Sequence, residues 1–211
     1  MNRYAPRVAA VSRSLAPRDP AVALTFDDGP DVTFTPAVLD ILSARGIRAT
    51  FFVVGKRAEE NPDIVRRIVA EGHALGSHTA SHPDLWELSL PAAIAEFRRG
   101  RRMLEAITGQ PVRLFRPPKG WMNLEQAAGL RAFGFRTWLW NVDPEDWAPG
   151  ATSESVLQGV GQLQSGDVVL LHDAIELPID PSTANRGATV AALPAIIDQV
   201  QAQGFELVTL S

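Results

Sequence analysis

The sequence predicts an α/β fold built on a parallel sheet. Short apolar segments of strand length alternate along the chain with longer segments that have the apolar spacing of helices. Ionisable residues directly follow several of the apolar segments, at the place where the carboxyl ends of parallel strands meet. About seven such strands in one domain form either an open doubly wound sheet or a closed, TIM-like (β/α) barrel.

Strands are expected where a short apolar run is bounded by turn residues. In chain order the expected strands are 21–26, 50–54, 74–77, 112–115, 135–140, 168–171 and 205–210. The segments 74–77 and 112–115 carry the weaker strand signal. Parallel strands need long crossover connections, so this order predicts βα units.

Helices are expected in those connections. Apolar spacing places them at 36–45, 62–71, 91–107, 124–133, 153–164 and 190–203. Pro62 and Pro91 stand at expected helix starts, where proline is tolerated, and Gly72 and Gly109 follow expected helix ends. Residues 1–20 are interpreted as an N-terminal arm and residues 21–211 as one domain.

Composition excludes several classes of protein. The chain has 211 residues, 45% of them hydrophobic, which is enough for a buried core and too many for a disordered chain. It has no cysteine, which excludes disulfides, thiolate metal sites, iron–sulfur clusters and a cysteine nucleophile. Its formal net charge of −4 argues against nucleic acid as a partner, and the basic run 98–102 is interpreted as a solvated helix face.

The sequence also bears on membranes and location. No apolar segment is long enough to cross a bilayer, so no membrane insertion is expected. Residues 1–20 contain four arginines and lack the apolar core of a signal peptide. A cytoplasmic location is therefore expected, with a secreted or cell-wall-associated location as the alternative if a targeting segment lies outside this sequence.

Two histidines and two aspartates form a candidate metal site. His78 and His82 are four residues apart, which places both imidazoles on one face of a helical turn, although such a pair alone is weak evidence. Asp27 and Asp28 follow the first expected strand, and two like charges in a crevice cost free energy unless a cation offsets them. Two imidazoles and one carboxylate leave coordination positions open for water and substrate, as in catalytic sites.

Five short motifs in this order resemble the signature of the polysaccharide deacetylases, the NodB-homology domains of carbohydrate esterase family four. They are T-F-D-D-G-P, H-T-x-x-H, R-P-P-x-G, D-x-x-D-W and L-H-D. The resemblance covers about 21–211, and the five motifs together are specific. It implies that this segment is a catalytic domain with a distorted (β/α) barrel, which hydrolyses N-acetyl and sometimes O-acetyl groups of sugars with the help of a metal.

The resemblance implies a role for each matching residue. Asp28, His78 and His82 would hold a divalent metal, with zinc expected first and cobalt, iron or nickel as alternatives. Asp27 would be the general base that takes a proton from the metal-bound water. Arg116 would pair with Asp27 and keep it oriented.

The later motifs supply the remaining roles. His172 would protonate the leaving amine as general acid, with its pKa raised by Asp146. The backbone N–H of Lys119 would bind the oxyanion, and Trp147 and Leu171 would line a pocket for the acetyl methyl group. The position of Lys119 is commonly aromatic in the family, so we hypothesise that its cation shifts preference towards acidic glycans.

The leading interpretation is a metal-dependent deacetylase acting on an N-acetylated carbohydrate such as peptidoglycan, a chitin-type oligomer, an exopolysaccharide or a small sugar. One alternative is an inactive carbohydrate-binding domain of the same fold, against which Asp27 and His172 both argue. A second is a non-haem iron oxygenase, which also uses two histidines and a carboxylate but mostly on other folds. The oligomeric state stays open.

Overall fold

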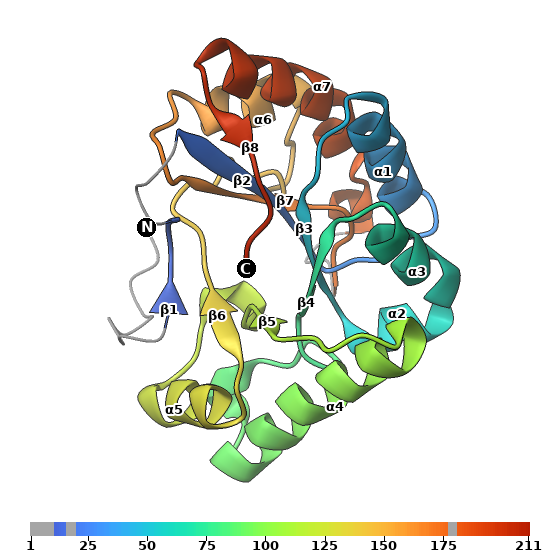
Figure 1. Ribbon diagram of the computed structural model, residues 1–211, viewed down its shortest axis with the longest axis vertical. Helices are drawn as coiled ribbons and strands as arrows, with labels where there is room; N and C mark the ends of the chain where they lie inside the picture. The colour runs from blue at the N-terminus through green and yellow to red at the C-terminus, as the bar shows by residue number, and fades with distance from the viewer. Residues whose placement is uncertain (1–10, 16–19, 177–180) are drawn as a thin grey trace.

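The strands form a curled parallel sheet with the helices packed around its outside (Figure 1). The computed structural model describes residues 11–15, 20–176 and 181–211. The strands are β1 (Val11–Ser12), β2 (Ala21–Asp27), β3 (Thr50–Val53), β4 (Ala74–Ser77), β5 (Leu114–Phe115), β6 (Arg136–Trp138), β7 (Val168–His172) and β8 (Glu206–Leu207). Their order is β1-β6-β5-β4-β3-β2-β7, with every neighbouring pair parallel. The expected fold of about seven parallel strands is confirmed.

The segment that follows β6 reaches β7 at the opposite edge of the curled sheet. Val142, which follows β6, forms a parallel bridge with Val169 of β7. The N–H of Leu170 also donates to the carbonyl of Val142 at 2.9 Å. The strands therefore surround an interior, as in the distorted barrel that the motifs imply, while β8 pairs with β2 off this path.

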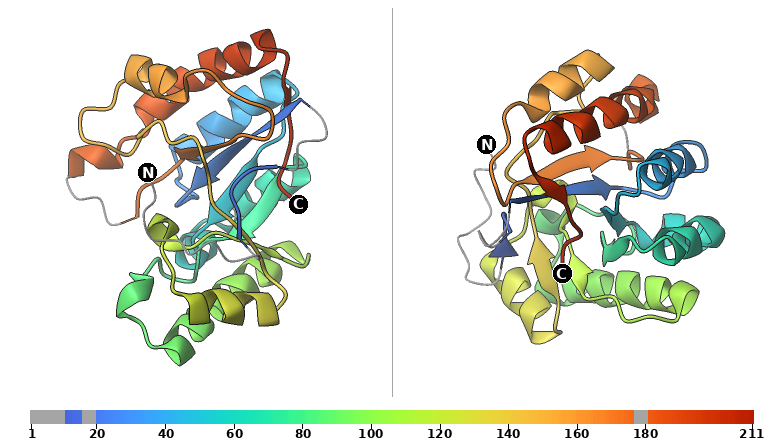
Figure 2. Two further views of the ribbon diagram at one scale, coloured as in Figure 1. Left: turned by 90° about the vertical axis from the view of Figure 1, so that its left-hand side faces the viewer. Right: turned by 45° about the horizontal axis from the view of Figure 1, so that its top comes forward.

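The helices occupy the connections between the strands (Figure 2). They are α1 (Phe34–Ala44), α2 (Gly55–Glu60), α3 (Pro62–Ala70), α4 (Leu90–Thr108), α5 (Leu124–Ala132), α6 (Ser153–Val160) and α7 (Gly187–Ala202). All six expected helices are present, but α6 ends four residues early, because Gly161 leaves the helical region with a φ of 58°. The short α2 was not expected.

The N-terminal arm contributes one short strand. Val11 and Ser12 form β1 and pair with Thr137 and Trp138 of β6. Residues 1–10 and 16–19 of the expected arm lie outside the described residues. The boundary at residue 20 stays a prediction.

Both faces of the sheet are buried, which explains why its strands are continuous apolar runs rather than alternating ones. On the outer face, Val22, Leu24 and Phe26 of β2 belong to the main core, together with Leu39 of α1 and Ile196 of α7. On the inner face a second cluster fills the barrel: Ala23, Phe52, Leu114, Trp138, Val168 and Leu210. Alternate residues of β2 thus pack against the helices on one face and fill the barrel interior on the other.

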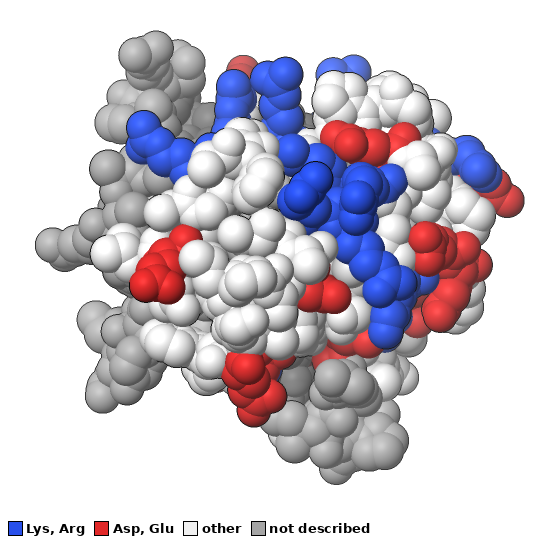
Figure 3. All heavy atoms as spheres, turned by 90° about the horizontal axis from the view of Figure 1, so that it is seen from below, with Lys and Arg blue, Asp and Glu red and all other residues white. Residues whose placement is uncertain are grey.

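The basic run 98–102 lies on α4. Arg98, Arg99 and Arg102 are exposed, while Gly100 between them is buried. Figure 3 shows the molecule from this side, with Lys and Arg side chains beside Asp and Glu side chains. The interpretation as a solvated helix face agrees with this exposure.

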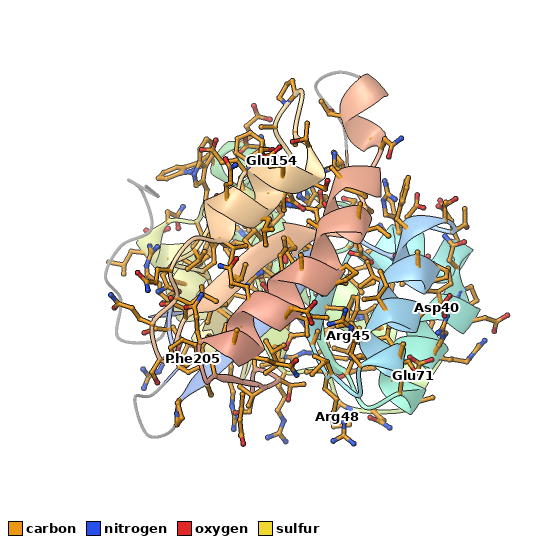
Figure 4. All side chains as sticks on the ribbon, turned by 90° about the horizontal axis from the view of Figure 1, so that it is seen from above. Asp40, Arg45, Arg48, Glu71, Glu154 and Phe205 are labelled. Carbon is orange, nitrogen blue, oxygen red and sulfur yellow. The ribbon has the colours of Figure 1, made fainter. Side chains whose placement is uncertain are left out.

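Ion pairs link the outer sides of α1 and α3. Arg67 binds Asp40 of α1 and Glu71, each at 2.6 Å, and Figure 4 labels both acids on the outside of the barrel. Partly exposed pairs of this kind contribute about 0–1 kcal/mol each, so the fold depends mainly on its apolar core. None of the helices in the described ranges is long and apolar enough to cross a membrane.

One helix contact is too close for a side chain. A Cβ added at Gly100 of α4 would lie 2.6 Å from the carbonyl carbon and oxygen of Thr79. Gly100→Ala should therefore lower the free energy of unfolding by about 1–3 kcal/mol, measured by urea denaturation, because a backbone segment would have to move.

Gly129 of α5 provides the matched control. Its added Cβ would meet side chains rather than backbone, Ile94 at 3.4 Å and Leu90 at 3.9 Å. Gly129→Ala should be neutral, or stabilising by roughly 0.5–1 kcal/mol through helix propensity. Equal effects of the two substitutions would contradict the packing described for α4.

Candidate active site

A cavity of about 480 Å³ opens at the carboxyl ends of the strands. Seven of the residues expected in the site line it: Asp27, Asp28, His78, His82, Lys119, Trp147 and His172. They come from all five motifs, which are far apart in the sequence. The parallel topology therefore brings the motifs together as expected.

Asp28, His78 and His82 are arranged so that they could hold one metal ion. Asp28 Oδ1 lies 3.2 Å from Nε2 of His78 and 3.3 Å from Nε2 of His82, and the three potential ligand atoms lie within 4.8 Å of one another. Two ligands of one tetrahedral zinc, each at about 2.1 Å, would lie roughly 3.4 Å apart. The donor set and its spacing therefore fit a divalent metal.

The protonation of this group also suits metal binding. His78 Nδ1 lies 2.8 Å from the carbonyl oxygen of Arg116. A carbonyl only accepts, so the proton lies on Nδ1, and Nε2 is the ring nitrogen that faces Asp28. Burial by itself would raise the pKa of Asp28, but hydrogen bonds and charge from His78 and His82 hold it well below its usual value.

Strained backbone is concentrated in the motif segments. Among the described non-glycine residues, φ is positive at Asp28 (72°), Thr79 (70°), His82 (53°), Lys119 (56°) and Glu145 (54°). Each such residue costs on the order of 1–3 kcal/mol, and strain of this kind occurs preferentially at functional sites. All five lie within the first four motifs.

Asp27 is held by a fully buried arginine. Arg116 Nη1 donates to Asp27 Oδ1 at 2.7 Å, while Asp27 Oδ2 faces Nε2 of His78 at 3.8 Å. Burial lowers the pKa of Arg116, and the charge of Asp27 opposes this effect. The other acceptors of the guanidinium are Thr25 Oγ1 and the carbonyl oxygens of Trp138 and Leu139. The expected contact is thus present, and it leaves one oxygen of Asp27 on the cavity side.

His172 and Asp146 form a second ion pair, in which Asp146 is buried and the His172 side chain is 12% exposed. Asp146 Oδ1 lies 2.7 Å from His172 Nδ1. Asp146 Oδ2 accepts from the backbone N–H of His172 at 2.8 Å and from the hydroxyl of Thr189 at 2.7 Å. Burial would lower the pKa of His172, but the charge and hydrogen bond of Asp146, together with Asp28 and Asp27, raise it to about 9. His172 therefore carries a proton at neutral pH.

Comparisons with known proteins agree with this geometry. The family described as polysaccharide deacetylase matches residues 15–138. A peptidoglycan-N-acetylglucosamine deacetylase of Bacillus cereus is 38% identical over 192 residues, which cover 90% of this chain and 86% of the relative. The chain belongs to the polysaccharide deacetylase family.

Further relatives of this deacetylase family carry two different names. A chitooligosaccharide deacetylase of Sinorhizobium fredii is 36% identical over 192 residues, which cover 88% of each chain. The crystal structure of the Bc1960 peptidoglycan N-acetylglucosamine deacetylase aligns with a TM-score of 0.87 at 34% identity. The alignment covers 95% of this chain and 91% of that one.

The prediction that Leu171 lines the acetyl pocket of this deacetylase is wrong. Leu171 is fully buried in the main core on the outer face of the sheet, where it pairs in register with Phe26. Leu170 lines the cavity instead, together with His172. Side chains of a strand alternate between the faces, so the residue two before His172 shares its side. Trp147 does line the cavity and is 39% exposed.

Sequence reasoning identified Trp147 but missed that Trp140 also belongs to an aromatic wall of the cavity. Trp140, which follows β6, lines the cavity, as does Trp121. Asp143 holds two of the tryptophans, because it accepts from Nε1 of Trp140 at 3.2 Å and from Nε1 of Trp147 at 3.3 Å. The signal for Trp140 in the sequence was the first aspartate of the D-x-x-D-W motif, Asp143, which binds it.

Lys119 departs from the aromatic residue common at its position in the deacetylase family. Its Nζ lies 3.1 Å from Asp84 Oδ2, so its charge is offset and the hypothesis of a preference for acidic glycans gains no support. Its backbone N–H has no hydrogen-bond partner within the described part of the chain. That N–H is therefore free to donate to a substrate.

The raised pKa of His172 predicts a pH-dependent contribution to stability. A pKa of about 9, compared with 6.5 in the unfolded chain, stabilises the fold fully below pH 6.5, and the effect is lost as the pH rises through 9. Asp146→Asn should remove on the order of 3 kcal/mol near pH 6 and much less near pH 10, measured by denaturant unfolding of the metal-free protein.

Asp198→Asn on the exposed side of α7 is the control. Asp198 pairs with Arg45 rather than with a histidine, so its substitution should have the same small effect at both pH values. A loss of stability for Asp146→Asn that did not change with pH would contradict the coupling to His172.

Proposed function

We propose that this deacetylase is a metal-dependent hydrolase that removes N-acetyl groups from peptidoglycan-type glycans. The observation that carries the proposal is the pair of adjacent aspartates with separate partners. Asp28 faces two histidines, whereas Asp27 is bound to Arg116 and faces the cavity. Peptidoglycan is placed before chitin-type oligomers because the Bacillus relative and the aligned structure carry that name.

Asp28, His78 and His82 would hold the metal, for which zinc suits the nitrogen and oxygen donors. Cobalt, iron and nickel accept the same donors and are the alternatives. The chemistry that such a metal supplies is a bound water whose pKa falls from about 15.7 to roughly 7.

Asp27 acts as the general base. Arg116 occupies its Oδ1, which leaves Oδ2 to accept the proton of the attacking water. The water then adds to the acetamide carbonyl, and the N–H of Lys119 donates to the developing oxyanion. Leu170 and Trp147 enclose the acetyl methyl group.

His172 acts as the general acid. Asp146 fixes its Nδ1, so the Nε2–H of the protonated ring is the proton that passes to the leaving amine as the C–N bond breaks. The products are acetate and a free amino sugar. The tryptophans of the cavity present flat apolar faces to the sugar rings.

The two alternative functions fit less well. An inactive carbohydrate-binding domain would not need the buried Asp27–Arg116 and His172–Asp146 pairs. A non-haem iron oxygenase shares the donor set, but those enzymes mostly use other folds than a parallel α/β barrel. A peptidoglycan substrate lies outside the cytoplasm, so on this proposal the secreted or cell-wall-associated location replaces the cytoplasmic one.

Acetate release from a panel of N-acetylglucosamine glycans tests the proposal. The parent should release acetate from peptidoglycan, lose activity with chelator and regain it with zinc. Asp27→Asn should lower turnover by about 10²–10⁴-fold and keep the metal, because base and ligand are separate residues. His78→Ala should lose both metal and activity.

Asp63→Asn serves as the control, because this side chain is exposed on α3 far from the cavity lining, and it should retain parent activity. A parent protein that releases no acetate from any glycan of the panel, with metal bound, would refute the proposal. Unchanged turnover in Asp27→Asn would refute its role as base.

A further inference from the structure

The segment that follows β7 contacts the metal site from outside the five motifs. The backbone N–H of Glu176 donates to Asp28 Oδ2 at 3.0 Å. Asp28 Oδ1 faces the two histidines instead. The two oxygens of this carboxylate therefore have different partners, and its orientation depends on where Glu176 lies.

Arg57 of α2 holds this segment in place. Its Nε donates to Glu176 Oε2 at 2.6 Å and its Nη2 donates to the carbonyl of Ile175 at 2.8 Å. The planar guanidinium thus donates at the same time to a side-chain carboxylate and to the preceding backbone carbonyl, from two nitrogens in fixed geometry. A lysine has a single nitrogen and cannot reproduce this arrangement. The side chains of Arg57 and Glu176 are only 24% and 23% exposed, so water screens this pair less than a surface pair.

The helix that carries Arg57 is also fixed to the histidine loop. The N–H groups of Gly55 and Lys56 donate to the carbonyls of Thr79 and Ala80 at 3.0 and 2.9 Å. These carbonyls lie between His78 and His82 in the sequence. The start of α2 therefore connects the loop of the two histidines with the segment that orients Asp28.

We propose that Arg57 is a positioning residue for the metal site. Through Ile175 and Glu176 it holds the amide that binds Asp28 Oδ2, so that Oδ1 alone is presented to the metal. The inference rests on the proposed metal site. Residues that orient metal ligands typically contribute about 10–100-fold to metal affinity, although they do not touch the metal.

Metal affinity of the purified full chain tests this role without any activity measurement. Zinc affinity is measured by competition with a chromophoric chelator, and ligand geometry by the visible absorption of bound cobalt. Arg57→Ala should weaken zinc binding about tenfold and alter the cobalt spectrum. Glu176→Gln should weaken it less, because the bond from Arg57 to the Ile175 carbonyl remains, and Arg57→Lys should lie between Arg57→Ala and the parent.

Arg66→Ala is the matched control, because Arg66 pairs with the exposed Asp63 on α3, and it should bind zinc like the parent. Parent-like affinity and spectrum in Arg57→Ala would overturn the inference, as would an equal loss in Arg66→Ala. If Arg57→Ala does not fold, judged by circular dichroism, the zinc affinity and cobalt spectrum of Glu176→Gln and Arg57→Lys are used instead. Weaker zinc binding than in the parent would support the inference, and parent-like binding in both variants would overturn it. If the parent binds no metal, both the metal site and the inference are refuted. If the parent binds metal but Arg57→Ala binds it equally well, only the role of Arg57 is refuted.

Discussion

Two buried carboxylates stand side by side at the end of β2, and the site depends on giving them different partners. Adjacent negative charges in a buried place are unfavourable unless each is compensated. Arg116 compensates Asp27 through a direct ion pair. Asp28 has a positive φ of 72° and faces two histidines. It also accepts a hydrogen bond from the backbone N–H of Glu176. This separation leaves one aspartate as a ligand and the other as a base.

The same contacts hold the barrel together. Arg116 follows β5, reaches Asp27 and Thr25 of β2, and also donates to the carbonyls of Trp138 and Leu139 at and after the end of β6. Thr25 in turn donates to the carbonyl of Val169 in β7. One buried side chain thus crosses the interior of the barrel and connects strands that are not neighbours in the sheet. Arg116 therefore both orients the base and links strands across the barrel.

The sequence predicted the elements whose signal is local. Apolar spacing identified six helices and seven strands, and motif order identified the two aspartates and two histidines of the site. It failed where the answer depends on geometry across the fold. The L-H-D motif names a leucine, but strand alternation from His172 selects Leu170 as the pocket residue. The contact between Arg57 and Glu176 joins residues 119 positions apart and leaves no local pattern.

The most direct test of the account is the position of bound zinc, located by anomalous X-ray diffraction at the zinc edge. We expect one strong peak about 2.0–2.2 Å from Nε2 of His78 and His82 and from the Oδ1 atom of Asp28, with Asp27 unligated and still bound to Arg116. A peak elsewhere, or one ligated by Asp27 in place of Asp28, would contradict it.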